Sequence, residues 1–178
     1  MEKLREFENC ADAVQALQED AEKKISAATT HYEIKDIPAM PKSGMSDGKP
    51  TYEITVYWQV DWASMTINMP SYSWPDMSDG EKAAVKGALG DLLAHEEGHV
   101  DITEAYIAEL SKEPIQINGT GATPTAATED CSVKLAIHEA QTIAELRRRQ
   151  EEYDDKTQHG VKQSEIGGVD VVLICPSK

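Results

Sequence analysis

The residues best suited to chemistry in this chain are His95, Glu96 and His99, which stand in the order H-E-x-x-H. On an α-helix, residues four apart lie on one face, so both imidazoles can bind the same zinc ion. Zinc lowers the pKa of a bound water to about 7, and Glu96 can then act as the general base while the activated water attacks a carbonyl. The spacing therefore predicts hydrolysis assisted by Zn2+.

A catalytic zinc usually has three protein ligands, so this motif leaves one to be found. The residues after His99 do not continue as H-x-x-G-x-x-H, which places the third ligand elsewhere in the chain. The first candidate is His159, because two antiparallel helices would return its segment toward the motif. The alternatives lie on the second predicted helix: His138, Glu139 and Glu145.

Three further residues are candidates for supporting roles. A hydroxyl near the metal can stabilise a developing oxyanion, so we predict that Tyr153 is catalytic. Asp154 can orient a histidine ligand, although a solvated acid at a helix end is an equal alternative for both residues. Gly98 lies inside the predicted motif helix, where glycine costs about 1 kcal/mol relative to alanine. We therefore expect another segment to approach the helix there, beside the metal or in ordinary tight packing.

Two long helices are predicted to position these residues. Ser78 and Glu81 form a capping-box pattern, so a helix should run from about residue 79 to 110 and carry the motif near its middle. A second helix is expected from about residue 130 to 153. Its apolar residues fall on one side of the helix: Val133, Ile137, Ala140, Ile143, Ala144 and Leu146.

A small sheet is predicted before the motif helix. Period-two alternation predicts a strand at residues 51–60, which residues 65–69 continue after a break that suggests a hairpin. A weaker pattern predicts a strand at residues 31–37, and residues 169–174 are predicted to form a final strand. The segments expected to be irregular are 38–50, 70–76 and 111–129.

We predict a single α+β domain over residues 1–178, with a small antiparallel sheet, two or three long helices and the motif on the central helix. Apolar residues at three- and four-residue steps predict an N-terminal helix within residues 1–29. Residues 161–178 should form a C-terminal strand or tail.

Charge and cysteine content limit the partners and the compartment. The net charge of −15 repels nucleic acid and anionic membrane surfaces, so neither is expected as a partner. No apolar run approaches the roughly 20 residues that cross a bilayer, and the first ten residues show no apolar signal-peptide region. None of Cys10, Cys131 and Cys175 forms a C-x-x-C pair. One disulfide with a free thiol and three reduced thiols are both open.

Two motifs, HEEGHVDI at residues 95–102 and YDDKTQHG at residues 153–160, resemble those of a bacterial family of predicted secreted zinc-dependent proteases. The similarity in layout covers roughly residues 30–160 and includes a Trp-Pro segment before the motif helix. The resemblance implies a zincin-like fold with Glu96 as base and three zinc ligands: His95, His99 and His159. It also implies a periplasmic or secreted location.

Together these patterns predict a zinc metallopeptidase that hydrolyses a peptide or protein substrate. An extended substrate is expected to pair with an edge strand, either residues 51–60 or a neighbour. The alternatives are a metal-binding module without turnover and a metal-free protein-interaction module. The sequence leaves the oligomeric state open.

Overall fold

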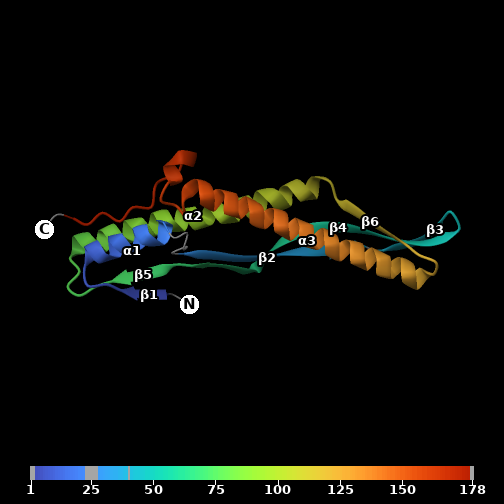
Figure 1. Ribbon diagram of the computed structural model, residues 1–178, viewed down its shortest axis with the longest axis horizontal. Coiled ribbons are helices and arrows are strands. Elements are labelled where there is room, and N and C mark those ends of the chain that lie inside the picture. The colour runs from blue at the N-terminus through green and yellow to red at the C-terminus, as the bar shows by residue number, and fades with distance from the viewer. Residues whose placement is uncertain (1–2, 23–27, 40, 177–178) are drawn as a thin grey trace. The chain divides into compact units, whose positions relative to one another are not determined.

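The computed structural model describes residues 3–22, 28–39 and 41–176, and these residues form an α+β structure with helices and a small antiparallel sheet (Figure 1). Contacts group the chain into two compact units. The first contains residues 1–31, 64–101 and 150–178, and the second contains residues 32–63 and 102–149. The prediction of one domain over residues 1–178 is not decided by this grouping.

The first unit begins with a strand, β1 (Lys3–Glu6), and a helix, α1 (Cys10–Glu22). β1 pairs in parallel with β5 (Pro70–Ser73), and Figure 1 shows the two strands side by side. α1 begins after Asn9, whose side-chain oxygen accepts a hydrogen bond from the amide of Asp12 at 3.2 Å and so caps the helix. The predicted N-terminal helix is therefore confirmed over α1.

The N-terminal prediction is wrong over residues 3–6. Four residues are too few for a periodicity test, and this segment takes its conformation from its partner β5. The expectation that residues 70–76 are irregular is wrong over residues 70–73, which form β5, and is confirmed over residues 74–76. The rest of the predicted helix, at residues 23–27, lies outside the described residues.

The helix that carries the H-E-x-x-H motif is α2 (Asp79–Lys112), and its predicted start is confirmed. Ser78 Oγ accepts a hydrogen bond from the Glu81 amide at 3.2 Å, and Glu81 accepts one from the Ser78 amide at 2.8 Å. These reciprocal bonds satisfy two amides at the start of the helix. In the described part of the chain, no helix combines the length and apolar composition needed to cross a membrane.

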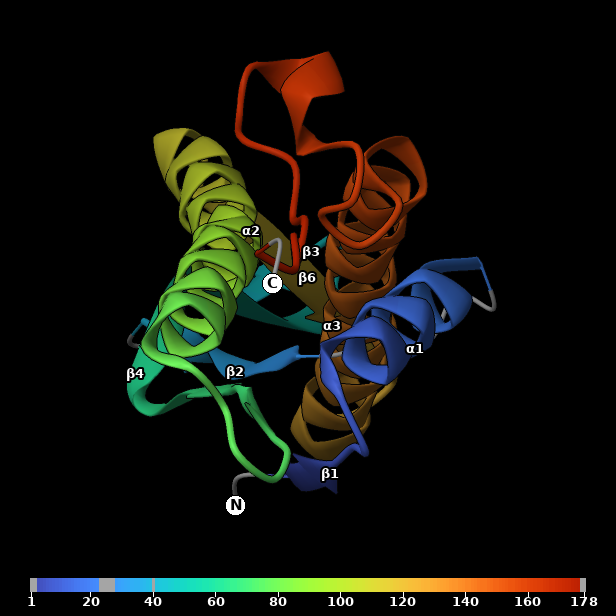
Figure 2. The same ribbon diagram turned by 90° about the vertical axis from the view of Figure 1, so that its left-hand side faces the viewer.

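The core of the first unit joins α1, the first turns of α2 and the C-terminal segment. Leu17, Leu92 and Leu173 are buried members of one cluster, and a disulfide links Cys10 with Cys175. Figure 2 shows the end of the C-terminal segment between α1 and the first turns of α2. The predicted strand at residues 169–174 is wrong: the segment has alternating burial but no strand pairing, and the Val171 amide donates to the Gly160 carbonyl at 3.0 Å.

The sheet of the second unit is built around one long strand. Its strands are β2 (Thr29–Pro38), β3 (Lys42–Ser46), β4 (Lys49–Asn68) and β6 (Ile115–Thr120). β4 pairs antiparallel with β3 and β6 and is also paired with β2. The buried residues of β4 alternate, and they are Ile54, Val56, Trp58 and Val60. The predicted strands at residues 31–37 and 51–60 are thus confirmed.

Several connections differ from the sequence prediction. No hairpin forms at residues 61–64, because β4 continues through them. Instead the hairpin lies between β3 and β4, with Asp47 and Gly48 in left-handed conformations at φ 50° and 74°. Residues 51–53 are not a free edge either, because they pair with β3 on one side and β6 on the other. The predicted loops at 38–50 and 111–129 therefore contain β3 and β6.

The second long helix, α3 (Pro124–Thr157), is confirmed and extends beyond its predicted ends. Its early start has a local cause, because Thr123 Oγ1 accepts a hydrogen bond from the Ala126 amide at 3.2 Å. Gly119 and Gly121 lie so close to the first turns of this helix that a Cβ on either would overlap with it. Glycine at these two positions permits β6 to pass directly beside α3.

Candidate metal centre

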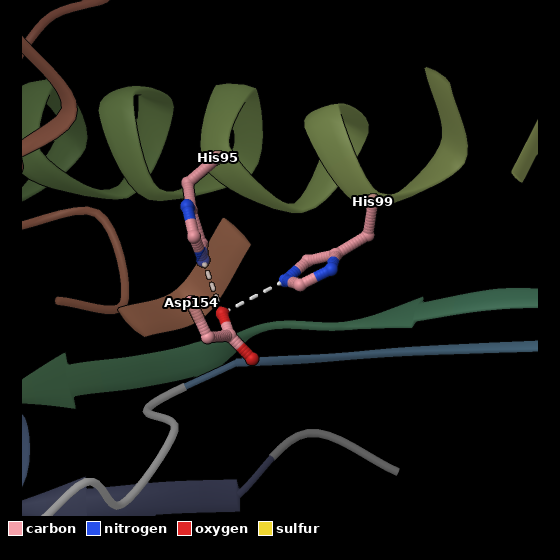
Figure 3. Close-up of side chains that lie close together, drawn as sticks. All are labelled: His95, His99 and Asp154. Atoms are coloured by element: carbon pink, nitrogen blue, oxygen red, sulfur yellow. Dashed lines mark ion pairs between the residues drawn. The ribbon is translucent and has the colours of Figure 1, made fainter. Parts of the chain in front are cut away.

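The candidate metal centre lies within the first unit and is formed by side chains from α2 and α3. His95 and His99 project from adjacent turns of α2, and Asp154 comes from the end of α3 (Figure 3). Asp154 Oδ1 is 3.3 Å from His95 Nε2 and 3.1 Å from His99 Nε2. The predicted convergence of His95 and His99 is therefore observed, with a carboxylate beside them.

These three side chains have the composition and spacing of a metal site. One donor atom from each lies within 4.8 Å of the other two. Two ligands of a tetrahedral zinc, with bonds of about 2.0–2.2 Å, are themselves about 3.3 Å apart. Within the described residues, His95 Nε2 and Asp154 Oδ1 are buried and have no hydrogen bond of acceptable geometry. A divalent cation would satisfy both atoms, so the residues present fit a metal ion.

His159 lies next to this cluster without belonging to it. Its Nδ1 atom is 3.3 Å from Asp154 Oδ1 and, among the described residues, has no hydrogen bond of acceptable geometry. The role of His159 as third ligand stays a prediction, whereas Asp154, expected to orient a ligand, is itself in the cluster. Asp154 was the less visible choice in the sequence, because it is one of five acids between residues 145 and 155.

The three alternative ligands on α3 have other contacts within the second unit. The His138 ring packs edge-on against Trp58, with centroids 5.9 Å apart. Glu145 forms ion pairs with Arg148 and Arg149, and these hold the pKa of its carboxyl at about 2. Burial and the neighbouring Asp36 carboxylate raise the pKa of Glu139.

Two glutamines fix the orientation of the histidine rings. Gln150 Oε1 is 2.5 Å from His99 Nδ1, and its Nε2 donates to the His99 carbonyl at 2.9 Å. Gln163 Oε1 is 3.1 Å from His95 Nδ1. An amide oxygen only accepts, so each Nδ1 carries the proton and each Nε2 offers a lone pair toward Asp154. No sequence signal indicated either glutamine.

Tyr153 supports His95 and explains Gly98. Its hydroxyl donates to the His95 carbonyl at 3.1 Å and accepts from Gln163 Nε2 at 2.9 Å, while its ring stacks on His95 with centroids 4.9 Å apart. A Cβ at position 98 would overlap with this hydroxyl. The expected close approach at Gly98 is therefore observed. The oxyanion role of Tyr153 stays a prediction.

A sharp turn after α3 brings Gln163 to His95. Gln158, His159 and Gly160 all adopt left-handed conformations, with φ of 48°, 54° and 92°. Such values are uncommon for the two non-glycine residues. Gly160 has no Cβ, which would lie 3.2 Å from the His95 side chain and 2.7 Å from Val171. Glycine at this position thus permits the chain to pass directly over His95.

Glu96 is buried next to the cluster. It has 1% exposure, and its Oε2 accepts a hydrogen bond from the Thr30 hydroxyl at 2.6 Å. Within the described residues, the other carboxylate oxygen has no hydrogen-bond partner. One oxygen is thus held in place while the other stays open to accept a proton. Thr30 precedes the predicted strand and was not recognised from the sequence.

The charges of the cluster stabilise one another. Burial alone would raise the pKa of Asp154, but the neighbouring imidazoles of His95 and His99 outweigh burial and hold that pKa well below its usual range. Burial alone would lower the pKa of His99, but the adjacent Asp154 carboxylate outweighs burial, so that pKa is raised. The site therefore carries a carboxylate that favours a nearby positive charge, as a cation site requires.

A family model described as "Bacterial protein of unknown function (DUF922)" matches residues 62–160. The matched segment contains the metal cluster and Glu96, and it ends at Gly160. No curated protein and no solved structure matches the chain. The similarity is to a bacterial family without an assigned activity, so the zinc-protease identity stays a prediction.

Proposed function

The chain belongs to the DUF922 family of bacterial proteins of unknown function, and we propose from its own side chains that it is a zinc-dependent peptidase. The observation that carries the proposal is the joint placement of three donor atoms within 4.8 Å of one another and of a buried glutamate beside them. His95 and Glu96 are consecutive in the sequence, so a ligand and a base are held on one rigid helix.

The metal would be held by His95, His99 and Asp154, with His159 as a further ligand candidate next to Asp154. Two neutral imidazoles and one carboxylate suit zinc, and their composition resembles that of catalytic zinc sites. A bound zinc ion would supply Lewis acidity, which acidifies water and polarises a carbonyl group.

The base would be Glu96. Its carboxylate has one oxygen fixed by Thr30, so the free oxygen can take a proton from water and pass it to the departing amine. Gln150 and Gln163 would keep the two imidazoles in the tautomer that binds the metal. A peptide or protein would be the substrate, as the H-E-x-x-H motif suggests.

Export is the second part of the proposal, and the disulfide between Cys10 and Cys175 supports it. Disulfides persist in oxidising compartments and are rare in the reducing cytosol. Cell fractionation of the native bacterium, with alkylation of free thiols before lysis, tests this point. We expect the protein outside the cytoplasm with Cys10 and Cys175 protected; a cytoplasmic, fully alkylated protein would contradict it.

Metal content is the first test of the peptidase proposal. Purified protein supplemented with zinc should contain about one equivalent, since the cluster forms one site. His95→Ala and His99→Ala should each remove most of it. Asp154→Asn and His159→Ala identify the third ligand. Substitution of the true ligand should lower zinc affinity by more than tenfold, and substitution of the other residue should have a smaller effect. Protein without zinc after supplementation would remove the proposal.

The second test separates a peptidase from a binding module. Glu96→Gln preserves the size of the side chain and should retain zinc while abolishing cleavage of a peptide library. A wild-type protein that binds zinc and cleaves no peptide in that library, with the variant behaving identically, would establish a metal-binding module instead. His138→Ala serves as a control, because this residue packs against Trp58 in the second unit and should affect neither measurement.

A further inference from the structure

The outward face of α3 in the second unit carries an exposed apolar stripe. Its large members, Val133, Ile137 and Ile143, have 59%, 53% and 42% exposure. The opposite face of the helix is buried through Cys131, Thr142 and Leu146. The sequence groups Leu146 with the exposed residues, but the structure separates it from them. Contiguous exposed aliphatic residues of this kind mark an interaction surface.

The stripe has the spacing of a coiled coil. Exposed residues recur at alternating steps of four and three: Glu129, Val133, Ala136, Ala140, Ile143 and Arg147. This is a heptad pattern, which is suited to a second helix rather than to a sheet or a flat surface. At a rise of about 1.5 Å per residue, the stripe is roughly 27 Å long. The alanines at its centre permit close approach of the partner.

We propose that this stripe is a dimer interface on which α3 of a second copy packs in antiparallel orientation. The charges at its two ends favour this occupant, because Glu129 is acidic and Arg147 is basic. In a parallel pair each end would meet its own charge, which is unfavourable. In an antiparallel pair each Glu129 meets Arg147 of the second copy, so the surface is complementary to itself.

The same arrangement aligns the apolar residues. An antiparallel copy centred level with residue 138 places Val133 opposite Ile143 of the second copy and Ala136 opposite its Ala140. Ile137, a member of the stripe that lies outside the heptad positions, comes near the two-fold axis, where it meets Ile137 of the second copy. Among the heptad positions, large residues thus meet toward the ends of the stripe and small residues near its centre, the alternation that well-packed helix pairs use.

The oligomeric state of the full chain tests the proposal. Light scattering after size exclusion, at micromolar concentration, should give a dimer. Ile137→Glu should give a monomer, since two carboxylates would meet at the axis. Gln141→Glu adds the same charge at an exposed position outside the stripe and should remain dimeric. Circular dichroism should show unchanged helix content in both variants. A monomeric wild-type protein, whatever else the stripe binds, would overturn the proposal, as would a dimer that Ile137→Glu leaves intact.

A charge exchange tests the orientation. Glu129→Arg and Arg147→Glu should each raise the dimer dissociation constant about tenfold, because each creates two repulsive contacts per dimer. The double variant should restore the wild-type constant, since the opposite charges meet again with their signs exchanged. Rescue requires that the two residues face each other across the interface. Weakening by both single variants without rescue would show that the copies do not pair in this orientation.

Discussion

Gln150 shows how the candidate metal centre would depend on residues that do not themselves bind the ion. Its side chain holds both Nδ1 and the carbonyl of His99. We predict that Gln150→Ala lowers zinc affinity about 10- to 100-fold, the usual effect of losing a hydrogen bond to a ligand histidine. Competition with a chromogenic chelator measures this constant.

Two comparisons make that measurement specific. Gln150→Glu still presents an acceptor to Nδ1 and should retain more affinity than Gln150→Ala. Gln141→Ala changes an exposed glutamine on the same helix and should leave the affinity unchanged. Equal affinity in wild type and Gln150→Ala would show that His99 is oriented without this contact.

Gly98 offers a second prediction at the scale of one residue. Alanine normally stabilises a helix relative to glycine, but a methyl group here would overlap with the Tyr153 hydroxyl. We expect Gly98→Ala to lower the free energy of unfolding by about 1–3 kcal/mol in urea titrations. On the same helix, Gly90 has open space at the Cβ position, so Gly90→Ala should raise it by up to about 1 kcal/mol.

The cause of the Gly98 effect can be isolated with a double-mutant cycle. In a Tyr153→Ala background the overlap disappears, and Gly98→Ala should then behave like Gly90→Ala. If Gly98→Ala is equally destabilising with and without the tyrosine, the contact at this glycine lies elsewhere.

At this scale the sequence was informative where chemistry is local. His95 and His99 are four residues apart on one helix, and Glu96 directly follows His95. Their convergence therefore follows from helical geometry alone. Three other contacts of the site join residues that are far apart in the chain. The separations are 68 positions for Gln163 and His95, 51 for Gln150 and His99, and 66 for Thr30 and Glu96. Glutamine and threonine have no motif that would indicate such contacts, and only the folded chain reveals them.

Among the elements, the start of α2 was predictable because its signal is short-range. Ser78→Ala removes the oxygen that caps the Glu81 amide, and should cost about 0.5–2 kcal/mol of unfolding free energy. Ser132→Ala, within α3, removes only a hydroxyl that donates to the Thr128 carbonyl and should be neutral or slightly stabilising. Equal losses from the two variants in urea titrations would contradict the capping role.

The strands show the opposite behaviour. β1, β3, β5 and β6 have four to six residues each, and all were missed or assigned to loops. Such segments become strands through their partners, and the side-chain pattern of four residues carries little information. β4, with 20 residues and a clear alternation, was recognised but was divided by a hairpin that does not exist. Asp61 and Ser64 mimic a turn at a point where the strand merely becomes more exposed.

For the molecule as a whole, the disulfide connects the two ends of the described chain. Cys10 and Cys175 are 165 positions apart, so the bond restricts most of the unfolded chain. We predict that the Cys10→Ser and Cys175→Ser double variant loses about 2–5 kcal/mol of unfolding free energy. Urea titrations with and without dithiothreitol measure the loss, and the reductant should destabilise only the wild-type protein.

The same bond should also affect the metal centre. The segment between Gly160 and Cys175 contains Gln163, whose contact with His95 requires the segment to stay folded against α2. Loss of the disulfide raises the population of states in which this segment has detached, and each such state leaves His95 Nδ1 without its acceptor. Zinc affinity of the double variant should therefore fall, and adding Gln163→Ala to it should have a smaller effect than in the wild-type protein. Fully additive losses would show that the disulfide and the metal centre are energetically independent.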